Sequence, residues 1–145
     1  MKVSDLEKFK LVNQFPNLRR ITIFKSNVTN IDIDWGKFPK LLIVNLAGFP
    51  HATKAHSSFY KNNIRFVTYA DMPNLQLGGK YFDLPEAKTL ELIRVGDTVP
   101  EFKGPWINTF TFVGYGIKTF PKGINDVVLT TVKLSDNRIN EVWSL

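Results

Sequence analysis

The sequence contains no cysteine, which excludes disulfides, thiolate nucleophiles and metal sites built from cysteine. It has only two histidines, His51 and His56, so little histidine-based chemistry is open to it. No apolar run approaches the ~18 residues that a transmembrane helix needs, and residues 1–10 lack the apolar core of a signal peptide. We therefore expect a cytoplasmic protein that does not insert into membranes, with export by another route left open.

What the chain does have is enough apolar material for one packed domain. Hydrophobic residues make up 43% of its 145 residues and charged residues 22%, and 12 of the residues are Phe. This composition argues against global disorder. The net charge is +6, but the charges are scattered along the chain, so they favour acidic partners only weakly.

A short apolar motif recurs along the chain with a nearly constant period. The motif is apolar-x-x-apolar-x-apolar, and its central residues are 23, 23, 23, 20 and 22 residues apart. An apolar-Pro pair stands three positions before it at Phe15-Pro16, Phe38-Pro39 and Leu84-Pro85. The six motifs are Leu18/Ile21/Ile23, Leu41/Val44/Leu46, Ile64/Val67/Tyr69, Ala87/Leu90/Leu92, Ile107/Phe110/Phe112 and Leu129/Val132/Leu134.

Each motif is typical of a short, half-buried β-strand, because its apolar residues alternate with polar ones. One turn of about 23 residues cannot bury its own apolar face, so successive turns must stack and their strands pair in parallel. This predicts a single interior stack of the central residues. An ordinary β-sandwich is the alternative, although a sandwich gives no reason for a constant phase. The predicted stack is Ile21, Val44, Val67, Leu90, Phe110 and Val132.

Over roughly residues 15–142 the chain resembles the leucine-rich repeat family, whose unit is about 20–29 residues. The last repeat matches the family pattern at Leu129, Val132, Leu134, Asn137, Ile139 and Val142. The resemblance implies an α/β solenoid, β-rich overall, with one curved parallel sheet on the concave face and irregular or 3₁₀ convex segments. It implies about six repeats in one domain over residues 15–145. In the other five repeats a different residue replaces the asparagine that the last repeat has at position 137. Those turns therefore need other hydrogen-bond partners for their amides. The replacing residues are Ser26, Phe49, Met72, Val95 and Tyr115.

The two ends of such a solenoid need covering. Ser4-Asp5-Leu6-Glu7 reads as a capping box, which predicts a short capping helix within residues 1–14. After the last motif the chain runs through Trp143 to Leu145 with no polar closing element. The last strand edge is then exposed, is covered by Trp143 and Leu145, or docks on another chain, with a homodimer through this edge as one hypothesis.

Function is predicted on the concave sheet face, where residues between the buried positions form four columns. They are Arg20/Ile43/Phe66/Thr89/Thr109/Thr131, Thr22/Asn45/Thr68/Glu91/Thr111/Lys133, Phe24/Ala47/Ala70/Ile93/Val113/Ser135 and Lys25/Gly48/Asp71/Arg94/Gly114/Asp136. Contiguous apolar side chains on a wet face indicate an interaction site, although they also cover one another across strands. We predict a non-catalytic module that binds another protein through Arg20, Phe24, Lys25, Ile43, Phe66, Thr68, Glu91, Ile93, Arg94, Val113 and Lys133.

No motif in the sequence indicates an enzyme or a cofactor, and we expect neither. His51 and His56 are five residues apart, which is off the spacing of a helical metal pair. Gly78-Gly79 is not followed by the Lys-Ser/Thr of a phosphate loop. A basic module for nucleic acid or an acidic surface is the alternative function, but the mixed charges of the columns disfavour nucleic acid.

Overall fold

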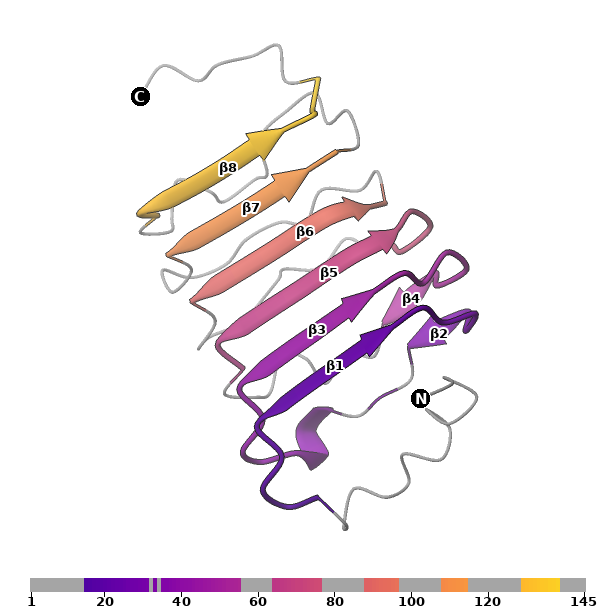
Figure 1. The fold of residues 1–145 in the computed structure, drawn as a ribbon, viewed down its shortest axis with the longest axis vertical. Helices are drawn as coiled ribbons and strands as arrows, with labels where there is room; N and C mark the ends of the chain where they lie inside the picture. Colours follow the sequence, from indigo (N-terminus) through magenta and orange to yellow (C-terminus); the bar gives the residue numbers. More distant parts are fainter. Residues whose placement is uncertain are drawn as a thin grey trace.

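A computed structural model describes residues 15–31, 33, 35–55, 64–76, 88–96, 108–114 and 129–138. The helix predicted within residues 1–14 lies outside these residues, as does the chain end that contains Trp143. Six strands form one sheet, in which every neighbouring pair is parallel (Figure 1). They are β1 (Arg20–Phe24), β3 (Ile43–Ala47), β5 (Phe66–Met72), β6 (Thr89–Val95), β7 (Thr109–Val113) and β8 (Thr131–Ser135).

The order of the strands across the sheet is the order in which they follow along the chain, β1-β3-β5-β6-β7-β8. Within the part of the chain that the structure describes, the single helical element is the three-residue 3₁₀ helix η3 (Trp35–Lys37). The prediction of a β-rich chain whose motif strands form a single parallel sheet is confirmed. The predicted alignment of the motifs is also confirmed, since each strand pairs with the next at the predicted residues.

The alternation of apolar and polar residues places one face of the sheet in the core. Ile21, Val44, Val67, Leu90 and Phe110 pair in register from strand to strand, and each is at most 6% exposed. Val132 continues this row on β8 but is 42% exposed, which corrects the prediction that it is interior. β8 is the edge strand of the sheet among the described residues, so Val132 has a neighbouring strand on one side alone.

The strands begin with the same backbone arrangement at every junction of the sheet. The Arg19 carbonyl accepts the amides of both Leu42 and Ile43, at 2.9 and 3.0 Å. Because the same arrangement repeats, the first residues of neighbouring strands are aligned with one another across the sheet. It recurs at Leu42 with Arg65 and Phe66, at Arg65 with Lys88 and Thr89, at Lys88 with Asn108 and Thr109, and at Asn108 with Thr130 and Thr131.

The turns that follow the strands differ in the group that stands at the position of Asn137. In the last turn Asn137 Nδ2 donates to the carbonyls of Phe112 and Ser135, at 2.9 and 3.0 Å. In the first turn Ser26 takes this position, and its hydroxyl accepts the Val28 amide at 3.2 Å. At the next turn Phe49 is buried instead, and its amide donates to the Asp71 carbonyl of the adjacent turn. The predicted substitute partners are therefore found in these turns.

A second, two-stranded sheet was not predicted. It pairs β2 (Asn30–Ile31) with β4 (Lys54–Ala55) in parallel, near the arrowheads of β1 and β3 in Figure 1. The amides of Thr53 and Gln76 continue this layer, because they donate to the carbonyls of Thr29 and Thr53. Apolar side chains of the connections fill the space between the layers, and the largest buried ones are Trp35, Phe38, Phe49, Leu41, Ile31, Ile64 and Leu75.

Candidate functional site

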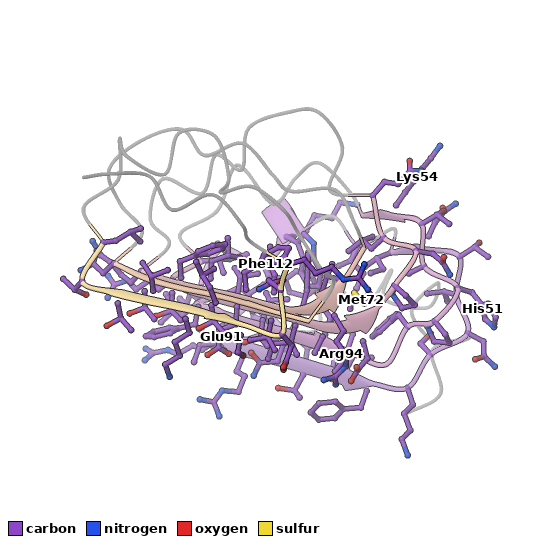
Figure 2. All side chains as sticks on the ribbon, turned by 90° about the horizontal axis from the view of Figure 1, so that it is seen from above. His51, Lys54, Met72, Glu91, Arg94 and Phe112 are labelled. Atoms are coloured by element: carbon purple, nitrogen blue, oxygen red, sulfur yellow. The ribbon has the colours of Figure 1, made fainter. Side chains whose placement is uncertain are left out.

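The face of the six-stranded sheet that points away from the core carries the predicted site. We call it the outer face and define it by three paired rows. In the side view of Figure 2, Glu91 of this face lies on the opposite side of the sheet from Phe112, which belongs to the core. The rows are Arg20/Ile43/Phe66/Thr89/Thr109/Thr131, Thr22/Asn45/Thr68/Glu91/Thr111/Lys133 and Phe24/Ala47/Ala70/Ile93/Val113/Ser135.

Two aromatic side chains on the outer face remain open to solvent. Phe24 is 61% exposed and Phe66 is 44% exposed. Phe66 pairs with Ile43 of the neighbouring strand, and Ile93 pairs with Val113 further along the sheet. These three aliphatic side chains are half-buried, whereas the two aromatic rings are exposed. The apolar surface therefore extends over β1 to β7 rather than sitting at a single point.

Polar contacts link neighbouring strands at the centre of this face. The Thr68 hydroxyl donates to Glu91 Oε2 at 3.0 Å, from β5 to β6. Arg94 Nε contacts Asp71 Oδ1 across the same two strands, with both side chains about half exposed. Both contacts join residues 23 positions apart in the sequence. They hold the carboxylates of Glu91 and Asp71 in place beside the apolar side chains.

The fourth predicted column proves to be a row of left-handed residues. Lys25, Asp71, Arg94 and Asp136 have φ between 50° and 56°, although none of them is glycine. Gly48 and Gly114 complete the row, at φ 74° and 80°. The left-handed conformation ends the regular alternation of side chains between the two faces of the sheet. In Figure 2 the side chain of Arg94 points to the same side of the sheet as that of Glu91. A Cβ added at Gly114 would lie 3.1 Å from Arg94 Cγ, so glycine leaves room for the arginine stem.

One residue of the outer face is buried, contrary to the prediction that its column is exposed. Thr111 is 6% exposed, and its hydroxyl has no hydrogen-bond partner among the described residues. In its row it lies between Glu91 and Lys133. In the first row of the outer face, Thr109 is half-buried and Thr131 is exposed.

The predicted site residues are brought together as a group. Nine lie in the three rows of the outer face and two, Lys25 and Arg94, stand in the left-handed row at its edge. Among the nine, Lys133 lies farthest along the sheet, on the edge strand β8. Sequence reasoning missed a further feature, the basic residues one position before the strands, although Arg19, Arg65 and Lys88 share the 23-residue spacing of the motifs.

The described residues contain no group of three His, Asp or Glu side chains arranged to hold a metal ion. His51 is exposed, and His56 lies outside the described residues. Among the described residues, no helix has the length and apolar character to cross a membrane. Comparisons with protein-family models, with curated proteins and with solved structures give no match to this chain.

Proposed function

We propose that the chain is a short leucine-rich repeat solenoid that binds another protein through the outer face and has no catalytic chemistry of its own. In this proposal the outer face is the concave face of the solenoid. The regular spacing supports it, because the carbonyls of Arg19, Leu42 and Arg65 each accept two amides from the next turn. The recurrence of a left-handed residue supports it as well, since successive members of this row are 23 residues apart at Lys25, Gly48, Asp71 and Arg94.

The observation that carries the binding proposal is the exposure of Phe66 and Phe24. A phenylalanine side chain contributes on the order of 200 Å², so the 44% of Phe66 that is exposed leaves about 90 Å² in water. Covering that area with a partner is worth about 2 kcal/mol at about 25 cal/mol per Å². We therefore expect a Phe66→Ala substitution to weaken binding by about 30-fold.

A matched control is available for this substitution. Phe15 is also 44% exposed, but it precedes β1 and is not part of the outer face. Wild type, Phe66→Ala and Phe15→Ala would be immobilised in equal amounts, and the proteins that each captures would be compared by quantitative mass spectrometry. Circular dichroism would first establish that the three have the same fold and melting temperature.

The proposal expects a protein that is retained by wild type and by Phe15→Ala and is lost with Phe66→Ala. Its dissociation constant, measured with the purified components, should then respond to Ile93→Ala as well. A capture profile that is the same for all three proteins would contradict binding through the outer face. Equal loss with both alanine variants would point to general stickiness of exposed aromatic rings.

The repeat itself can be tested by changing the number of turns. A tandem duplication of residues 43–65 adds one full period of 23 residues. A solenoid accepts it, because each turn contacts only its neighbours, and should unfold cooperatively with unchanged or higher stability. A duplication of residues 43–53 adds about half a period and should disrupt folding. Loss of folding in both cases would contradict the solenoid.

The hypothesis that a second copy docks at the C-terminal edge stays a prediction. β8 is an edge strand, and Val132 on its core side is 42% exposed. Size-exclusion chromatography with light scattering on wild type and Val132→Lys would detect a dimer and its loss.

A further inference from the structure

A glutamate lies at the centre of the outer face, on the internal strand β6. Glu91 is half-buried, and its neighbours in the row are Thr68 of β5 and Thr111 of β7. In Figure 2 its side chain points away from the core, on the side of the sheet opposite to Phe112. A partner that covers the centre of this face therefore covers the Glu91 carboxylate as well.

A hydrogen bond from the neighbouring strand orients this carboxylate. The Thr68 hydroxyl donates to Glu91 Oε2 at 3.0 Å. A hydroxyl is a neutral donor, so the bond fixes the position of the carboxylate and leaves its negative charge in place. Glu91 thus sets a charge at a defined point of the outer face, where a partner side chain has to match it.

Apolar side chains stand beside this charge on the same face. Ile93 follows Glu91 by two residues on β6. On β5, Phe66 pairs with Thr89, two residues before Glu91. With about 4.8 Å between strands and about 3.3 Å per residue, the Cα atoms of Phe66 and Glu91 are about 8 Å apart. One lysine or arginine side chain spans this distance, because its aliphatic stem packs on apolar surface while its charged end binds elsewhere.

The energetics of covering this face set a condition on the partner. Covering the exposed part of Phe66 strengthens binding by about 30-fold. A charge that is taken out of water without a counter-charge costs on the order of 100-fold or more in an equilibrium constant. A partner that places a neutral or acidic side chain over Glu91 would therefore lose what contact with Phe66 contributes.

We propose that the protein bound by the outer face presents a lysine or arginine whose stem lies on Phe66 and whose charge pairs with Glu91. This inference rests on the proposed function, because it names the chemistry of the same partner. The net charge of +6 disfavours a cationic partner at long range, but salt screens that repulsion beyond about 8 Å. Lys133 lies two strands from Glu91, at about 10 Å. Arg94, on the same side of the sheet, is in contact with Asp71.

The test is a selection from a phage library of random 12-residue peptides at 150 mM NaCl on immobilised wild type, Glu91→Gln and Asp136→Asn. Glu91→Gln removes the charge and keeps an acceptor for the Thr68 hydroxyl. Asp136→Asn is the matched control, because it removes the same charge from an exposed position directly after β8, outside the three rows. Asparagine also tolerates the left-handed φ of 56° at this position. Circular dichroism would establish that all variants are folded, and peptides that bind Phe66→Ala equally well are set aside.

Among the peptides that require Phe66, we expect lysine or arginine beside an apolar residue to be enriched over the unselected library. The enrichment should appear on wild type and on Asp136→Asn and be absent on Glu91→Gln. Fluorescence anisotropy then measures the tightest peptide with its cation replaced by neutral citrulline or acetyl-lysine. This replacement should weaken binding by at least about tenfold to wild type and by less than about twofold to Glu91→Gln. Equal enrichment on Glu91→Gln, or equal weakening in the two proteins, would overturn the inference.

Failure of this inference is distinguishable from failure of the proposed function. If peptides that require Phe66 are selected but show no enrichment of cations, only the cationic chemistry of the partner is wrong. If no selected peptide requires Phe66, the outer face is not the binding site, and the proposed function fails together with the inference.

Discussion

Gly96 marks a place where the backbone of one turn nearly touches the next. It is buried directly after β6, with φ at 52°, and its amide donates to the Met72 carbonyl at 3.1 Å. A Cβ added there would lie 2.4 Å from the carbonyl oxygen of Leu75, against a lower limit of about 3.0 Å for real Cβ contacts. The obstacle is backbone, so no side-chain rotation relieves the contact. A Gly96→Ala substitution therefore forces the two turns apart.

The expected cost has two parts. A left-handed conformation costs an alanine about 1–2 kcal/mol, partly offset by about 0.4–1 kcal/mol from the restricted unfolded chain. Overpacking against the Leu75 carbonyl adds about 1–3 kcal/mol. We expect Gly96→Ala to lower the free energy of unfolding by about 2–4 kcal/mol. Gly48→Ala is the control, because Gly48 is also left-handed but its added Cβ would meet its nearest neighbour at 3.3 Å.

Urea denaturation followed by tryptophan fluorescence measures both variants, since Trp35 is fully buried and reports on the core. The free energy of unfolding should fall by about 1 kcal/mol in Gly48→Ala and by clearly more in Gly96→Ala. If the two variants lose the same stability, the close approach of Gly96 to the Leu75 carbonyl does not exist in solution. The slope of the free energy against urea should stay unchanged in both, because neither substitution changes the area buried on folding.

Three further substitutions test the turns and the polar contacts, each by urea denaturation. Lys25→Gly should raise the free energy of unfolding by about 0.5–1 kcal/mol, because glycine tolerates the φ of 56° better than lysine does; a decrease would contradict this conformation. Asn137→Ala should lower it by about 1–3 kcal/mol, because two backbone carbonyls lose their donor, and an unchanged value would contradict these hydrogen bonds. A double-mutant cycle on Arg94→Gln and Asp71→Asn should give a coupling of at most about 1 kcal/mol, since both side chains are about half exposed. A larger coupling would mean that the pair is screened from water.

Much of the fold follows from the sequence because the motif has two simple periods. The alternation within a strand decides which side chains face the core, as for Ile21 and Ile23 against Phe24. The 23-residue spacing decides which residues pair, so Phe66 lies between Ile43 and Thr89. For the same reason the sequence predicts which residues form the outer face. Whether they bind a partner stays a prediction, because exposure alone names no ligand.

The tertiary structure decided what depends on a neighbouring turn. The left-handed φ values at Asp71 and Arg94 were not predicted, since glycine, the residue that favours this conformation most, is absent at both positions. Val132 has the same motif position as Val67, yet it is exposed, and among the described residues β8 is the edge strand of the sheet whereas β5 is internal. Position 96 needs glycine because a Cβ there would collide with the carbonyl oxygen of Leu75, which is 21 residues earlier in the chain. A linear pattern records the spacing of such residues, whereas their packing depends on which groups the finished sheet brings within contact distance.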